Sequence, residues 1–163
     1  MTVLINNLVK ELAAVQEEKS WIGTNFNDQL NALSEQDFFS KLADLHSIAE
    51  IISHLTTWRK ESILKLKTGT GSITDADPTN WISNEFLRKI GKDQIIAAYN
   101  ESLEQIILLL ESKNDSYLSE TYFDTDFKGY YSYDFLLKGV LQHDIYHLGQ
   151  IGLIHNLIKK QKA

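Results

Sequence analysis

Two histidines near the C-terminus, His143 and His147, are the residues whose type and spacing most directly indicate chemistry. On a helix, positions four apart differ by about 40° around the axis and about 6 Å along it. Both imidazoles can therefore face one metal ion, as histidines with this spacing often do. The alternative is two core histidines with separate hydrogen-bond partners, and the spacing alone favours neither interpretation.

The two histidines continue a run of apolar residues at helical spacing. The run consists of Leu136, Val140, Ile151 and Ile154. We therefore expect both imidazoles on the buried face of a helix. A buried polar group without a partner costs on the order of 1–3 kcal/mol. A shared metal ion would bind one nitrogen of each ring, while carbonyls or carboxylates hold the other nitrogens.

A tight site needs a third ligand, and the remaining histidines are His46, His54 and His155. His155 lies eight residues beyond His147, about 12 Å along a straight helix, which is too far for bonds of about 2 Å to one ion. We expect His155 at the surface or facing a partner. His46 and His54 are also eight residues apart, so at most one of them joins the site. We prefer His54, which lies on an apolar face two turns inside a helix, whereas His46 precedes the helix cap.

Long helices are expected to position these histidines. Only one proline is present, and tracts rich in leucine, isoleucine, alanine, glutamate, lysine and glutamine run between a few glycines. Helices are predicted at about 3–19, 47–67, 77–113 and 132–160. A capping box of Ser47 and Glu50 indicates the start of the second helix. Asp77 and Pro78 predict the start of the third, with Gly91 as an interruption.

The predicted fold class is all-α, a four-helix bundle in a single domain over residues 1–163. The connections are too long to assure the simplest up-down arrangement. A short helix is expected at about 27–33 and a short extended piece within 114–131, but no strand signal is strong enough to build a sheet.

Charge and composition argue against several classes of partner and metal ligand. The formal net charge is −6, and the only basic run is the C-terminal KKQK at 159–162, which argues against nucleic acid as a partner. Without cysteine, any metal must be held by nitrogen and oxygen. The longest apolar run, at 106–110, is too short to cross a bilayer, and the N-terminus lacks the features of a signal peptide. We expect a cytoplasmic protein that acts on a small molecule.

Two segments together resemble the DinB/YfiT-like metal-binding superfamily. They are SIAEIISHLTTW at 47–58 and QHDIYHLGQI at 142–151. WIG at 21–23 and YYSY at 130–133 are similar to it as well, so the resemblance covers nearly the whole chain. It implies a DinB-like antiparallel bundle with a long crossover connection, commonly assembled as a homodimer.

The resemblance also implies that His54, His143 and His147 bind a divalent metal. Zinc or nickel is the expected ion, with iron or manganese as alternatives. Characterised relatives include thiol-dependent transferases and isomerases, in which the metal activates a low-molecular-weight thiol such as bacillithiol or mycothiol.

A site of three histidines leaves at least one coordination position open. Zinc there would lower the pKa of bound water toward about 7, or deprotonate an incoming thiol. The leading hypothesis is a metal-dependent enzyme, a thiol S-transferase or else a hydrolase. The alternatives are a non-catalytic metal-binding or stress-associated bundle, and a bundle whose histidines are merely hydrogen-bonded.

Residues near the histidines have expected roles of their own. Asp144 echoes the carboxylate of zinc peptidases, but aspartate is one methylene shorter than glutamate there, so we expect it beside a ligand or at the surface. Gln150 faces the site or binds backbone. Trp58 and Tyr146 line a pocket or belong to the core. The glycines at 149 and 152 suggest close packing by another helix, within the subunit or across a dimer.

Overall fold

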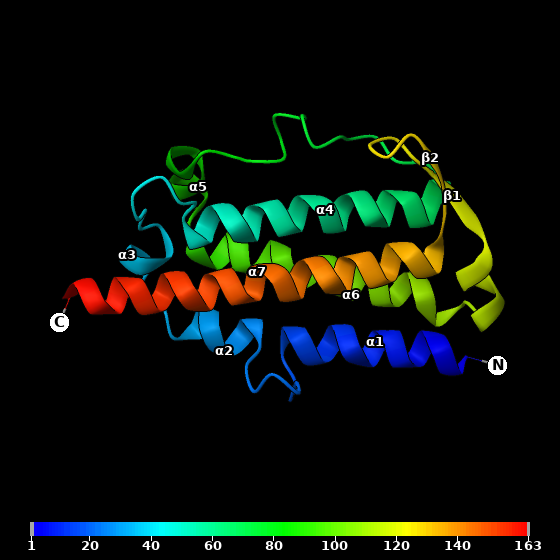
Figure 1. Ribbon diagram of the computed structural model, residues 1–163, viewed down its shortest axis with the longest axis horizontal. Helices are drawn as coiled ribbons and strands as arrows, with labels where there is room; N and C mark the ends of the chain where they lie inside the picture. Colours follow the sequence, from blue (N-terminus) through cyan, green and yellow to red (C-terminus); the bar gives the residue numbers. More distant parts are fainter. Residues whose placement is uncertain (1, 163) are drawn as a thin grey trace.

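Most of the chain is helical in the computed structural model, which describes residues 2–162 (Figure 1). The helices are α1 (Val3–Gln16), α2 (Phe26–Asn31), α3 (Glu35–Phe38), α4 (Ile48–Thr68), α5 (Asn84–Ile90), α6 (Lys92–Glu111) and α7 (Tyr133–Lys162), with a 3-10 helix η1 (Asp115–Ser119). Strands β1 (Thr121–Asp124) and β2 (Gly129–Ser132) form a small antiparallel hairpin. The prediction of a mainly helical fold is confirmed, and the expected extended piece is this hairpin.

The four long helices lie side by side in Figure 1. α4 contacts α6 and α7, and α1 contacts the same two helices. The hairpin and η1 lie together at one end, and α3 and α5 lie toward the other. None of the helices within residues 2–162 combines the length and hydrophobicity needed to cross a membrane.

Local capping chemistry defines α4 as predicted. The Ser47 hydroxyl accepts from the Glu50 amide at 3.1 Å, and the Glu50 carboxylate accepts from the Ser47 amide at 2.9 Å. Gly69, at a φ of 74°, ends the helix in the left-handed conformation that glycine adopts without strain. His54 therefore lies two turns inside a helix with well-defined ends.

The third helix does not begin at Asp77 and Pro78, which corrects the prediction. Asp77 Oδ1 instead accepts from the Thr79 amide at 2.9 Å, as an aspartate does in a turn. Helix starts only after Ser83, whose hydroxyl accepts from the Phe86 amide, and Gly91 separates α5 from α6 as predicted. Residues 70–83 thus form an extended connection along the outside of α4 (Figure 1).

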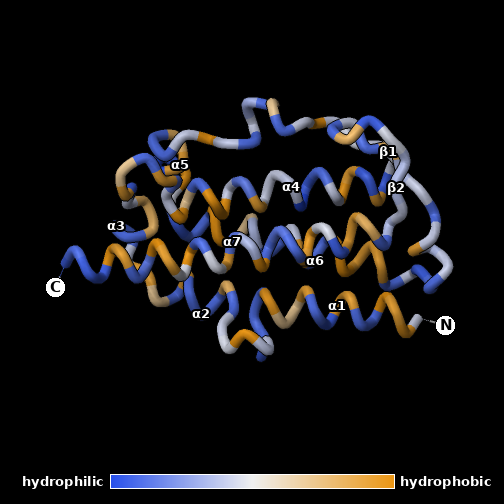
Figure 2. Tube along the Cα trace, in the orientation of Figure 1, coloured by the Kyte–Doolittle hydropathy of each residue, from blue (hydrophilic) through white to orange (hydrophobic). Residues whose placement is uncertain are grey.

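The apolar interior consists of two clusters along the length of the helices. Hydrophobic residues alternate with hydrophilic ones along each long helix (Figure 2). One cluster gathers around α2, α3 and the first half of α4, and the other around α1, η1 and the hairpin. Leu55 and Leu148 belong to the first cluster, whereas Ile63 and Val140 belong to the second. The histidines and their polar neighbours lie between these two clusters.

Candidate metal centre

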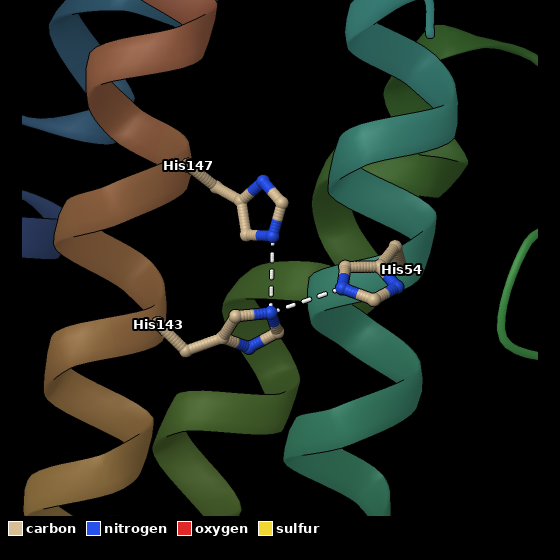
Figure 3. A group of neighbouring side chains, drawn as sticks. All are labelled: His54, His143 and His147. Atoms are coloured by element: carbon tan, nitrogen blue, oxygen red, sulfur yellow. Dashed lines mark hydrogen bonds between the residues drawn. The ribbon is translucent and has the colours of Figure 1, made fainter. Parts of the chain in front are cut away.

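Three histidine side chains converge between α4 and α7, as predicted for His54, His143 and His147 (Figure 3). The Nε2 atoms of His54 and His143 are 2.9 Å apart, and those of His147 and His143 are 3.0 Å apart. The ligand atoms that the three residues offer all lie within 4.8 Å of one another. His54 and His143 are 89 positions apart in the sequence, yet they present nitrogen atoms to the same point as His147.

The hydrogen bonds of the outer ring nitrogens determine which nitrogens face the centre as lone pairs. His54 Nδ1 lies 3.1 Å from the backbone oxygen of Asn80, so Nδ1 must carry the proton. His147 Nδ1 lies 2.6 Å from Oε1 of Gln150, which fixes its proton in the same way. The Nε2 atoms of His54 and His147 are then acceptors without a hydrogen.

The neutral histidines cannot satisfy all three Nε2 atoms among themselves. Nε2 of His143 carries at most one proton, which it can donate to only one of its two neighbours at a time. At least one lone pair therefore faces another nitrogen without a donor. A cation between the rings would bind all three lone pairs, so the donor set fits a metal ion.

The spacing and the ligand type also fit a divalent ion. Bonds of about 2.1 Å in a tetrahedral site place ligand nitrogens about 3.4 Å apart. The contacts of 2.9 and 3.0 Å would need to open by only about half an ångström. Imidazole nitrogen suits zinc, nickel and iron alike, so the ligands do not choose among them.

Burial keeps the three imidazoles neutral, as metal ligands must be. Burial, together with the neighbouring His147 and His54, lowers the pKa of His143 to about 3. Burial likewise lowers the pKa of His147 to about 4. The pKa of His54 is lowered for the same reason, although the hydrogen bond to Asn80 opposes the shift.

Asn80, which the sequence did not single out, fixes the orientation of His54. Its side chain is buried and accepts from Trp58 Nε1 at 2.8 Å. Its amide group donates to the backbone oxygen of Asp75 at 2.9 Å. These contacts hold the backbone oxygen of Asn80 beside His54 Nδ1, so the 70–83 connection forms part of the site.

Trp81 from the same connection covers the outer side of His54. Its ring is stacked on His54 at 4.0 Å and on His46 at 3.7 Å between ring centroids. Two rings parallel to a third at these distances can only lie on its opposite faces. His46 therefore contributes to the site through Trp81 and does not join the three histidines.

Asp144 lies neither beside a metal ligand atom nor at the surface, which corrects the expectation for it. Its carboxylate contacts the Arg59 guanidinium at 2.6 Å, and both side chains are buried. Burial opposes the charge on Arg59, but the attraction of Asp144 outweighs it and raises the pKa of the guanidinium. Arg59 also donates to Gln16 and Tyr99, so this network joins α4 to α7, α1 and α6.

The remaining residues of α7 with expectations from the sequence lie in different environments. His155 is outside the histidine cluster as predicted, but it is buried, so its expected surface position was wrong. Gln150 faces the site, and Tyr146 is largely exposed. A Cβ added at Gly149 or Gly152 would meet no atom of another element within 4 Å, so no other helix in residues 2–162 packs closely there.

A cavity of about 330 Å³ opens beside the histidines. His54 and His143 line it from α4 and α7, and Trp58 forms part of its wall, which is one of the two positions expected for it. The hairpin region contributes Tyr122 and Phe127 to the lining. A small molecule in this cavity would contact the histidine cluster directly.

Comparison with known proteins identifies one family. The family model described as the DinB superfamily matches residues 20–151, a range that includes all three histidines. No curated protein and no solved structure matches the chain.

Proposed function

The chain belongs to the DinB superfamily, and we propose that it is a metal-dependent enzyme in which His54, His143 and His147 hold one divalent ion. The observation that carries this proposal is the meeting of three Nε2 atoms that share too few protons to satisfy one another. Zinc or nickel is the ion we favour, because both accept three imidazoles and a further ligand.

The residues around the histidines serve to orient them. Asn80 and Gln150 accept from the outer nitrogens, which keeps the inner lone pairs directed at one point. The buried ion pair of Arg59 and Asp144 joins α4 to α7, the two helices that carry the histidines. A divalent ion bound there would lower the pKa of a neighbouring water or thiol and so supply a nucleophile near neutral pH.

We propose thiol transfer as the reaction, with hydrolysis as the other use of the same site. The chain has no cysteine, so a sulfur nucleophile must come from a low-molecular-weight thiol. The thiol gives its proton to solvent, its sulfur forms a bond to carbon of the acceptor, and the bond from that carbon to the leaving group breaks, so that the leaving group departs with the electron pair. The cavity supports an enzyme over a metal store, because about 330 Å³ is the size of a small-molecule site.

We also propose the bundle architecture and the oligomeric state that the resemblance to the family implies. The side-by-side packing of α1, α4, α6 and α7 supports a four-helix bundle with long crossover connections. A homodimer and a cytoplasmic location belong to the proposal as well. The exposed Tyr146 and Leu153 on α7 are candidates for the dimer contact.

Metal analysis of the purified protein tests the site. Wild type is expected to retain about one equivalent of zinc or nickel per chain, and His54→Ala and His143→Ala each lose most of it. His155→Gln, which removes a histidine from α7 outside the cluster, should retain the metal. Stoichiometric metal in both alanine variants would exclude the assigned ligands.

The reaction needs a separate assay. Metal-loaded protein is mixed with a low-molecular-weight thiol and an electrophilic acceptor, and product is compared with that of chelator-treated protein. Turnover only in the loaded sample supports transfer. Equal rates in the two samples would count against it, whatever the metal content.

A further inference from the structure

The cavity beside the histidines is elongated along α4 and α7. His54, Trp58, Ser62 and Lys65 follow one another at helical spacing on one face of α4 and line it. Eleven residues separate His54 from Lys65, which is about 16 Å along a helix axis, less the backward lean of the lysine. The histidines therefore lie at one end of the cavity, and Lys65 lies toward the hairpin end.

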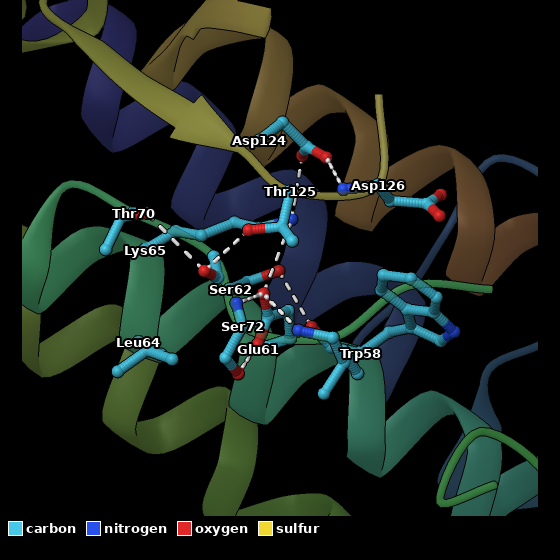
Figure 4. A network of polar contacts seen from close by, with 12 residues as sticks. Trp58, Glu61, Ser62, Leu64, Lys65, Thr70, Ser72, Asp124, Thr125 and Asp126 are labelled. Carbon is cyan, nitrogen blue, oxygen red and sulfur yellow. Dashed lines mark hydrogen bonds and ion pairs between the residues drawn. The ribbon is translucent and has the colours of Figure 1, made fainter. Parts of the chain in front are cut away.

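Lys65 has little positive charge to offer a ligand (Figure 4). Its ammonium contacts the Asp124 carboxylate at 2.8 Å and lies 3.9 Å from Glu61, and all three side chains are buried. Two carboxylates thus surround one ammonium group. An anionic ligand would have to approach this negative pair, so the buried lysine does not make the cavity an anion site.

Two further carboxylates of the lining have no cation beside them. Within residues 2–162 no salt bridge joins Asp75 or Asp126 to a basic group. Asp126 Oδ1 accepts from the Asp75 amide at 2.9 Å, so the two residues are neighbours on the side of the connection and hairpin. Their charges leave the cavity wall negative in the absence of a ligand.

Aromatic side chains form much of the remaining wall. Trp58 stands on α4, Phe127 in the turn of the hairpin and Phe135 in the first turn of α7. Aromatic faces attract cations through their quadrupole and also bury apolar surface. Carboxylates combined with aromatic faces favour a positively charged ligand over a neutral or negative one of equal size.

We infer that this cavity binds a small molecule with an apolar or aromatic body and a cationic group, an amine or a quaternary ammonium. The inference rests on the proposed function, since it assigns the ligand to the cavity beside the histidines. The cationic group lies near Asp75 and Asp126, and the remainder of the molecule packs against Trp58 beside His54 and His143.

Gly139 provides a way to close the cavity without disturbing the fold. It lines the cavity from α7, yet a Cβ added there would meet no atom within 4 Å. A leucine at this position would occupy the cavity itself. Gly152 is the matched control, because it is a glycine of the same helix, equally open, and outside the lining.

Three probes that share a benzyl or phenyl body and differ in charge test the inference. They are benzyltrimethylammonium, benzyl alcohol and benzoate; the first keeps its charge at every pH and has no lone pair for a metal. Binding is followed on chelator-treated and on metal-loaded protein through the indole N–H signal of Trp58, assigned with Trp58→Phe. We expect the cation to bind most tightly, and benzoate least, in the chelator-treated protein.

The variants locate the binding. Asp126→Asn should weaken binding of the cationic probe about two- to fivefold, the range for one partly exposed carboxylate. Added salt should reduce this difference in affinity between wild type and the variant. Asp44→Asn removes an equal charge outside the lining and should have no such effect. Gly139→Leu should abolish binding, whereas Gly152→Leu should not.

Benzoate binding as tight as that of the cation, or no binding of any probe, would overturn the inference. Cation binding that survives Gly139→Leu would overturn it too. Because the chelator-treated protein is measured separately, these outcomes do not depend on whether the histidines bind metal. Failure of the proposed function would appear instead in the metal analysis.

Discussion

The side-chain oxygen of Gln150 accepts a hydrogen bond from Nδ1 of His147 at 2.6 Å, one helical turn further along α7. The contact leaves Nε2 of His147 as a lone pair that faces His143. Gln150 is not one of the three histidines, yet it determines which nitrogen of His147 faces the other two.

Gln150→Ala is therefore expected to weaken metal affinity about 10- to 100-fold, the usual effect of removing a partner of a ligand histidine. Gln150→Glu keeps an acceptor and should retain most of the affinity. Competition with a chromophoric chelator measures both. Gln142→Ala, an exposed glutamine of the same helix, is the control, and equal affinities of the two alanine variants would refute the role of Gln150.

The metal-free protein is expected to lose stability as the pH falls from about 7 to about 5. Burial lowers the pKa of His143 to about 3 and that of His147 to about 4, while histidine in an unfolded chain titrates near 6.5. Between these values the unfolded chain binds protons that the folded chain does not. The free energy of unfolding therefore decreases as the pH falls through 6.5.

Thermal unfolding of chelator-treated protein at several pH values checks this expectation. A variant carrying both His143→Gln and His147→Gln should show a flatter dependence, because it lacks the two groups. Carboxylates with a lowered pKa, such as Glu50, lose their contribution only below about pH 4.5. A wild-type Tm that does not change between pH about 7 and 5 would contradict the prediction.

Asp144→Ala should destabilise the protein by about 3–5 kcal/mol, because it leaves the buried Arg59 without its counterion. Replacing both partners, Arg59→Met with Asp144→Leu, should recover most of that loss. Urea denaturation measures both variants. If the double variant is as unstable as Asp144→Ala, the unpaired charge is not the cause.

Gly149→Ala and Gly152→Ala should each stabilise the subunit by about 0.5–1 kcal/mol, since glycine is costly inside a helix and the added Cβ meets no atom within 4 Å. Denaturant unfolding at low protein concentration measures the gain. Sedimentation at high protein concentration tests whether these glycines also pack against a second subunit. Weaker self-association of the variants would indicate that a partner subunit packs against them.

The parts of the fold that depend on local chemistry could be predicted from the sequence. The ends of α4 follow from Ser47, Glu50 and Gly69, whose capping interactions involve only neighbouring residues. The convergence of His143 and His147 follows from helical geometry, and the apolar flanks of His54 favoured it as their partner.

The connection at 70–83 could not be predicted in the same way. Asp77 and Pro78 are as suitable for a turn as for a helix start, and the structure uses the turn. Asn80 therefore fell within a predicted helix, and its contact with His54 was not expected. Its contact with His54 spans 26 residues, and no periodicity indicates a contact of that kind.

The burial of His155 and Asp144 depends on which elements cover them. The rise along a helix excludes His155 from the histidine cluster, but it does not predict that α3 lies beside the end of α7, where Lys162 contacts Asp37. Asp144 faces away from the ligands, and only the packed structure shows that Arg59 of α4 lies opposite it.

The position of Trp81 has an optical consequence. Its indole is about one-third exposed and lies 4.0 Å from the imidazole of His54, so an ion at the three histidines would be close to an intrinsic fluorophore. Nickel or copper would quench its emission and zinc would not. Quenching of the Trp81 emission would thus distinguish nickel or copper from zinc at the three histidines.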